Sequence, residues 1–187
     1  MLTIVVPSTE LFDDTTQMFI MTKPVTITLE HSLISLSKWE AKWKRPFLKE
    51  NDRKTTEEVL DYIRCMTITP NVSDNTYMAI SANTEICEQI QAYINDPMTA
   101  TTFSNIENKP VKNRQVVTSE LIYYWMIQLN IPVEFQKWHL SRLLTLIKIC
   151  EIKNSAAMNK QKASKNAIRN RNRSLNAQRK ARLGTSG

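Results

Sequence analysis

The stretch TSELIYYWMIQLNIPVEFQKWHLSRLLTLIKIC, residues 118–150, carries the strongest structural signal in the chain. Its apolar residues recur at helical spacing in two runs that an Asn-Ile-Pro turn at residues 130–132 separates. Thr118 or Ser119 can cap the first helix, and a second helix is predicted from about Glu134 to Ile152. Two apolar stripes joined by a short turn favour antiparallel packing, so we expect this pair at the centre of the core.

Upstream of this pair, the sequence predicts shorter helices. Apolar residues with helical spacing follow Ser32 and end before Pro46, because a residue that precedes proline is driven out of the helical region. Thr55 and Glu58 have the spacing of a capping box at the start of a second helix. A short turn is expected at residues 73–80, and a longer helix from Asn83 or Thr84 to about residue 96.

The first 30 residues read instead as strands. Residues 2–6, 16–22 and 25–29 are rich in β-branched residues, and residues 25–29 alternate strictly, whereas residues 10–14 have the composition of a polar turn. The predicted fold class is therefore mainly α (α+β), with a small N-terminal antiparallel β-sheet at residues 1–30, a helical body at residues 31–152 and a basic C-terminal tail at residues 153–187.

Charge divides the chain in the same way. After Glu151 the sequence contains ten Lys and Arg residues and no acid, whereas the rest of the chain holds 15 basic against 18 acidic residues. The tail has few large apolar residues, so we expect it to be disordered in isolation and to bind a polyanion or an acidic protein surface. A nucleic acid is one such polyanion. The residues predicted to make this contact are Lys160, Lys162, Lys165, Arg169, Arg171, Arg173, Arg179, Lys180 and Arg182.

The sequence offers little for catalysis. Its only glycines, Gly184 and Gly187, exclude the glycine-rich loops that cradle phosphates and the glycine-flanked serine of hydrolases. His31 reads as a capping or surface residue, and His139 lacks a neighbouring acid. Three cysteines without a C-x-x-C pair favour buried, reduced thiols over a metal site or a disulfide framework. We therefore expect no enzyme activity, no cofactor, no metal and no membrane span.

The aromatic residues Trp39, Trp43 and Phe47 stand beside Lys42, Lys44 and Arg45. Tryptophans on helical stripes usually pack in a core. Because basic residues flank these three aromatic side chains, we also consider them a candidate surface for a protein partner.

Several stretches of the chain resemble a family of small proteins encoded by tailed bacteriophages. They are residues 29–33, 36–40 and 45–48, then Ile-Tyr-Tyr-Trp-Met at 122–126, Trp-His-Leu-Ser-Arg-Leu-Leu-Thr-Leu-Ile at 138–147, and the C-terminal run that begins at Leu175 and includes Leu-Gly-Thr at 183–185. The resemblance covers nearly the full chain and is strongest to the tail assembly chaperones of long-tailed phages.

This resemblance implies a non-enzymatic protein that binds the tape measure protein, keeps it soluble and recruits tail tube subunits, as part of an oligomer or larger assembly. The expected location is the host cytoplasm, with retention in the virion as an option. A head-tail connector, a neck or baseplate component, and a nucleic-acid-binding protein that uses the basic tail are the alternatives.

Overall fold

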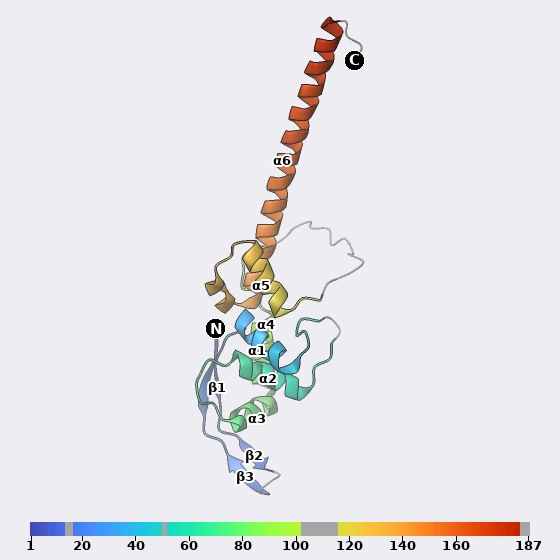
Figure 1. Ribbon diagram of the computed structural model, residues 1–187. Coiled ribbons are helices and arrows are strands. Elements are labelled where there is room, and N and C mark those ends of the chain that lie inside the picture. The colour runs from blue at the N-terminus through green and yellow to red at the C-terminus, as the bar shows by residue number, and fades with distance from the viewer. Residues whose placement is uncertain (14–16, 50–51, 102–115, 184–187) are drawn as a thin grey trace. The chain divides into compact units, whose positions relative to one another are not determined.

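The computed structural model describes residues 1–13, 17–49, 52–101 and 116–183, and within the last helix it leaves out the side chains of residues 156–164, 166 and 183. Four strands come first, β1 (Leu2–Val6), β2 (Glu10–Asp13), β3 (Met18–Met21) and β4 (Val25–Leu29). The helices follow, α1 (Leu33–Trp43), α2 (Thr56–Met66), α3 (Asp74–Ala82), α4 (Thr84–Asn95), α5 (Ser119–Gln128), the short 3-10 helix η1 (Val133–Lys137) and α6 (Leu140–Leu183). The mainly α class with a small antiparallel sheet is confirmed (Figure 1).

The inner sheet pairs β1 with β4 in antiparallel register, from Leu2 opposite Leu29 to Val6 opposite Val25. Alternation along both strands turns Ile4, Val6, Ile27 and Leu29 into the core, as the strict pattern of residues 25–29 predicts. The segment after α2 lies along the free edge of β4, where the Ile68 amide donates to the Thr28 carbonyl over 3.0 Å.

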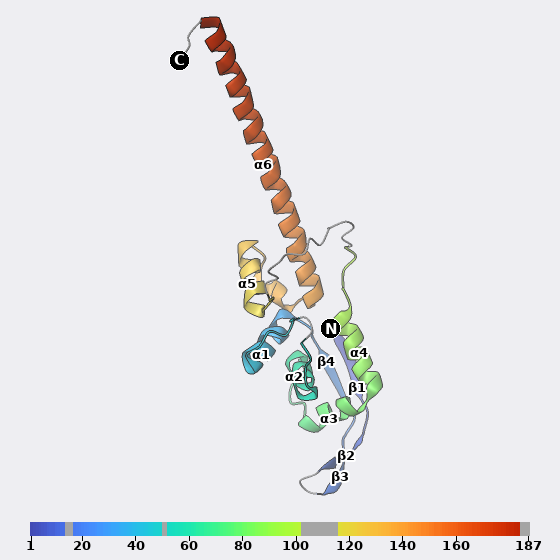
Figure 2. The same cartoon turned by 90° about the vertical axis from the view of Figure 1, so that its right-hand side faces the viewer.

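The outer sheet, β2 with β3, continues the same register beyond an interruption. Val6 pairs with Val25 and Glu10 with Met21, so Pro7 stands opposite Pro24 at the break. The chain therefore forms two separate two-stranded sheets, and Figure 2 shows β2 and β3 as a pair beyond β1 and β4. The polar turn predicted at residues 10–14 is wrong for Glu10–Asp13, which form β2, and Asp14 lies outside the described residues.

Helix caps appear where the sequence places them. The Ser32 side chain caps α1, and Thr55 and Glu58 form the predicted capping box of α2. Asn83 caps α4 and Thr118 caps α5. Helix α1 ends at Trp43, with Lys44 in the left-handed conformation just before Pro46.

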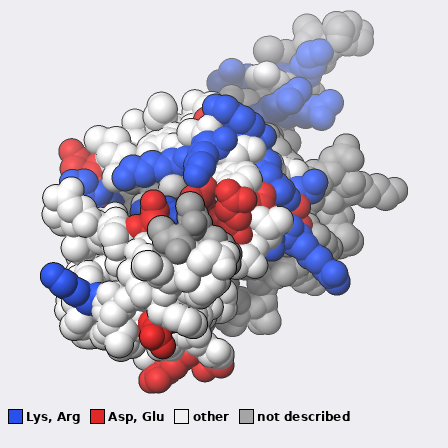
Figure 3. All heavy atoms as spheres, turned by 90° about the horizontal axis from the view of Figure 1, so that it is seen from below, with Lys and Arg blue, Asp and Glu red and all other residues white. Residues whose placement is uncertain are grey.

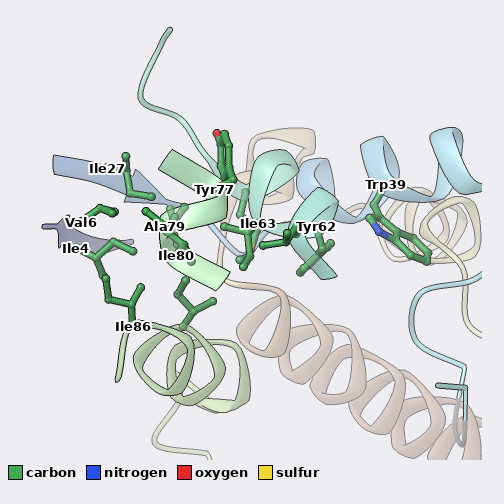
Figure 4. Close-up of a cluster of buried hydrophobic side chains, with 14 residues drawn as sticks. Ile4, Val6, Ile27, Trp39, Tyr62, Ile63, Tyr77, Ala79, Ile80 and Ile86 are labelled. Atoms are coloured by element: carbon green, nitrogen blue, oxygen red, sulfur yellow. The ribbon is translucent and has the colours of Figure 1, made fainter. Parts of the chain in front are cut away.

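Two apolar clusters form the interior. The larger lies between the inner sheet, the buried side of α1 and helices α2, α3 and α4, and Figure 4 shows Ile4, Ile27, Ile63 and Ile80 converging there. The smaller joins α5 and the start of α6 to Leu33 and Leu36 of α1. The helical pair predicted as the centre of the core therefore builds the smaller cluster, and it shares that cluster with α1.

The second helix of this pair begins and ends at other residues than predicted. Residues 133–137 form the 3-10 turn η1, and α6 starts at Leu140 instead of Glu134. It also continues past Ile152 to Leu183, because the chain after Pro132 contains no proline and no glycine until Gly184. The expected end of the helix near Ile152 is wrong, since residues 153–183 are helical.

The chain divides into two compact units, Met1–Ile147 and Lys148–Gly187. The first, here called the body, contains both apolar clusters. The second consists of the α6 turns from Lys148 onward, here called the basic helix. Among the described helices none combines the length and the apolar character that crossing a bilayer requires.

Candidate functional site

The three aromatic residues predicted as a partner surface do meet in space. The Trp39 and Trp43 rings stack with centroids 6.1 Å apart, and the Phe47 ring meets Trp39 edge-on at 4.9 Å. Phe47 also stacks on Tyr62 of α2 at 3.9 Å. The cluster thus fastens α1 and the loop after it to α2.

The burial of these side chains shows that the prediction of a partner surface is wrong for Trp39. Trp39 is fully buried, and its Nε1 donates to the Glu58 carbonyl over 2.8 Å, so it offers no surface to a partner. Trp43 is half-buried and donates from Nε1 to Asp61 Oδ2 over 3.0 Å. Trp39 is therefore a core residue, whereas Trp43 and Phe47 are partly buried and pack against the core.

Phe47 does reach a cavity that sequence reasoning missed. An apolar pocket of about 360 Å³ opens between the loop after α1 and helices α2 and α4. Lys54 stands at this pocket, with Nζ 4.5 Å from the centroid of the Phe47 ring. An apolar hollow beside one cation suits an aliphatic or aromatic group that carries a negative charge. The lining residues are Phe47, Lys54, Val59, Tyr62, Ile63, Cys87, Ile90, Gln91, Ile94 and Asn95.

Cys87 is the thiol of this pocket. Its Sγ donates to the Ile80 carbonyl over 3.3 Å, and burial raises its pKa above the ordinary value for a thiol. Burial likewise raises the pKa of Cys65. Protonated thiols in apolar surroundings are weak nucleophiles, so both cysteines behave as packing residues.

A network of ion pairs joins α2 to Lys42 of α1 and to Asp74 of α3. Asp61 is buried and accepts from Lys42, Trp43 and Arg64. Burial by itself raises the pKa of Asp61, but the bonds from Lys42 and Arg64 outweigh burial and leave the pKa below its ordinary value. The carboxylate is thus held charged and fully occupied, which describes a structural group and not a free acid.

Glu40 is a second buried carboxylate with a structural role in the body. Its side chain is buried, with Oε1 accepting from the Phe47 amide over 2.9 Å and Oε2 from the Ser119 amide over 2.7 Å. The second bond satisfies a free amide in the first turn of α5. One carboxylate therefore joins the loop after α1 to a helix that begins 79 residues later.

The two histidines meet in the body although 108 positions separate them in the sequence. His31 is buried and its Nδ1 lies 2.6 Å from the Tyr62 hydroxyl, and the His31 and His139 ring centroids are 4.9 Å apart. His139 Nε2 lies 3.0 Å from the Tyr93 carbonyl, and the Leu140 amide donates to the His31 carbonyl. The expectation that His31 is a capping or surface residue is wrong, because this pair clamps the start of α6 to the β4–α1 junction.

Burial is also the main influence on the charge of this pair. Burial, followed by the neighbouring His139, lowers the pKa of His31 to about 4. Burial lowers the pKa of His139 as well, although its bond to the Tyr93 carbonyl acts in the opposite direction. Both rings are therefore neutral near pH 7, and in the part of the chain that the structure describes no cluster of three metal-ligating side chains surrounds them.

The predicted polyanion-binding residues all lie on the basic helix. Their described side chains are exposed, namely Lys165, Arg169, Arg171, Arg173, Arg179, Lys180 and Arg182. The side chains of Lys160 and Lys162 lie outside the described part. Ile168 and Leu175, 57% and 42% exposed, are seven residues apart and so share one face of the helix. The basic helix can thus offer cations together with an apolar strip.

Comparison of the chain with family models, curated proteins and solved structures finds no match. The assignment of a function therefore depends on the geometry of the basic helix and the pocket.

Proposed function

We propose that this chain is a non-enzymatic assembly protein that binds an acidic protein partner through its basic helix. In the particular form that the family resemblance favours, it is the tail assembly chaperone of a tailed phage, acting in the host cytoplasm on the tape measure protein or on tail tube subunits. A connector, neck or baseplate component would use the same helix for the same kind of contact.

One observation carries the proposal, the coexistence of cations and exposed apolar side chains on a continuous helix. No acidic residue follows Glu151, so no internal partner within this helix neutralises Arg169, Arg171 or Arg173. Ile168 and Leu175 stand exposed among them. An amphipathic acidic helix is the ligand that would cover both kinds of group at once.

The pocket beside Phe47 adds a second point of contact on the body. Its apolar wall and Lys54 suit an anchoring side chain next to a carboxylate. The histidine pair, Asp61 and Glu40 supply no competing catalytic arrangement, because each is occupied by contacts that hold helices together.

The test uses the full chain and a helical, acidic fragment of the tape measure protein encoded in the same genome. We expect the native chain to keep the fragment soluble and to bind it. Replacing Ile168 and Leu175 together by Ser should weaken this binding by roughly tenfold or more, because apolar anchors contribute much of the energy of such contacts. Asn172→Ser with Asn176→Ser is the matched control on the same helix and should change nothing.

A nucleic-acid-binding role is the second candidate, since exposed arginines on a helix also suit phosphates. Duplex DNA distinguishes it from protein binding. If the Ile168/Leu175 variant binds the protein fragment as well as the native chain does, and DNA affinity falls steeply with salt over several phosphates, the nucleic-acid role replaces the one proposed.

A further inference from the structure

The β2–β3 hairpin exposes large apolar side chains on a strand that has no buried residue. Met18, Phe19 and Met21 are each between 66% and 68% exposed, and the Phe12 ring meets the Phe19 ring edge-on at 5.2 Å. Figure 3 views the molecule from below, the side on which the hairpin lies in Figure 1, and shows uncharged residues over much of this face with charged residues of both signs among them. Exposed apolar strands of this kind mark contact surfaces.

The pattern of hydrogen bonds between the two strands of the hairpin shows which backbone groups of β3 point away from β2. The Thr22 amide donates to the Thr9 carbonyl over 2.9 Å, and the Thr9 amide donates to Thr22 Oγ1 over 2.8 Å, so Thr9 and Thr22 occupy a hydrogen-bonded position of the ladder. Pairs alternate along an antiparallel ladder, which makes Leu11 and Ile20 the next hydrogen-bonded pair. The amides and carbonyls of Phe19 and Met21 therefore face away from β2, and among the described residues no backbone bond reaches them from outside the hairpin.

We propose that β3 pairs antiparallel with β3 of a second copy of this chain, with Ile20 on the two-fold axis. In that register Phe19 lies opposite Met21 of the second copy, and Met21 opposite Phe19. Both residues have outward-facing amides and carbonyls, so each strand satisfies the other. The two hairpins then form one four-stranded sheet, in which the Phe19 side chain lies beside Met21 of the second copy and both lose part of their exposed surface.

The distribution of charge favours the edge of β3 over the edge of β2 as the contact surface. Residues 18–21 carry no charge, whereas β2 begins with Glu10, whose negative charge disfavours pairing with the same edge of a second copy. Sheet edges are commonly protected by lysine or proline, but the first such residues after β3 are Lys23 and Pro24, beyond the strand. An uncharged, self-complementary edge fits an identical strand.

The contact is small. Stable interfaces bury about 800 Å² on each partner, and a four-residue strand supplies less, so we expect association at roughly 10 to 500 µM of the chain. Within an assembly that gathers many copies, this weak pairing is sufficient to order them.

A register-specific cross-link tests the proposal on the full chain. Ile20→Cys places two thiols directly opposite each other at the axis, at the spacing that disulfides require, so mild oxidation should give a covalent dimer. Phe19→Cys is the matched control, since its two thiols would stand on Cα atoms about 8 Å apart, beyond disulfide reach. The native chain, with Cys65, Cys87 and Cys150, gives the background.

Sedimentation velocity tests the association without a cross-link. The native chain should form more dimer as its concentration rises. Phe19→Lys should raise the concentration at which half of the chains are dimeric at least about tenfold, because it places a charge on the edge of β3. Ile127→Lys, at an exposed apolar residue of α5, should leave this concentration unchanged. Equal cross-linking of the two cysteine variants, or a native chain that stays monomeric up to about 500 µM, overturns the proposal.

Discussion

The body and the basic helix are helical for different reasons. In the body, helices α1 to α4 are short and bury a face against the inner sheet or a neighbouring helix, and α1, α2 and α4 carry side-chain caps. The described side chains of the basic helix from residue 165 onward are exposed, and no acidic residue follows Glu151 to balance their cations. Ala, Arg, Lys and Gln are good helix formers, so intrinsic propensity holds this helix, whereas burial holds those of the body.

This difference predicts which property of the protein a mutation in each region changes. Changes in the body alter the free energy of unfolding, because side chains there lose contacts that nothing replaces. Changes in the basic helix alter binding and helix content but leave the unfolding of the body nearly unaffected. Three experiments test this difference between the two regions.

The largest effect is expected for Trp39→Ala. The substitution removes a fully buried ring and leaves the Glu58 carbonyl without its donor, which should lower the free energy of unfolding by about 3 to 5 kcal/mol. Urea denaturation followed by circular dichroism measures it. Leu175→Ala on the basic helix is the counterpart, and a loss above about 1 kcal/mol there would contradict the distinction between the two regions.

A somewhat smaller effect is expected from pH. The pKa of His31 is about 4 in the folded body against about 6.5 in an unfolded chain, so the unfolded state binds more protons between these values. Stability of the body is therefore full above pH 6.5 and falls as the pH drops toward 4, by about 2 to 3 kcal/mol. Urea denaturation at a series of pH values measures it.

His31→Gln is the control for this pH dependence. The groups facing His31 are His139, the Tyr62 hydroxyl and Tyr93, and the two tyrosines stay neutral throughout because burial raises their pKa values. The variant should lose most of the slope between pH 6.5 and 4. An unchanged slope would assign the acid sensitivity to His139 or to carboxylates elsewhere.

The smallest effect is expected for salt on the basic helix. Lys165, Arg169 and Arg173 follow one another at four-residue spacing, where like charges each cost about 0.2 to 0.5 kcal/mol. Screening should therefore raise the helix content of residues 148–183 between low and high salt. Backbone chemical shifts in NMR spectra of the full chain measure this helix content. Chemical shifts that do not change with salt would indicate that intrinsic propensity alone determines the helix content.

Much of the fold could be predicted from local signals. Thr55 with Glu58, Asn83, Thr118 and the alternation of residues 25–29 each act within a few residues of the structure they specify. The errors have local causes too. Residues 10–13 read as a turn because they hold Glu10 and Asp13, yet they pair with an apolar strand. The loss of apolar residues after Ile152 predicts a helix end there, although no proline or glycine breaks the helix at that point.

The site was less predictable, because it depends on contacts between distant residues. Trp39 lies on a stripe in the sequence, but only the position of α2 decides that the stripe faces inward. His31 and His139 have no local pattern that would reveal their contact. The pocket is lined by Ile63, Cys87 and Ile90, which the sequence marks as core residues, and only the fold brings these residues of α2 and α4 together.

The division of the strands into two sheets, at Pro7 and Pro24, has a consequence for local opening of the hairpin. Because the backbone bonds of β2 with β3 are separate from those of β1 with β4, the outer bonds can be lost while Ile4 stays paired with Ile27. Ile4 and Ile27 are buried in the core, whereas β3 has no buried residue, so opening of the outer sheet costs less free energy than opening of the inner one. The break in pairing thus separates a part of the hairpin that opens readily from a part that the core holds closed.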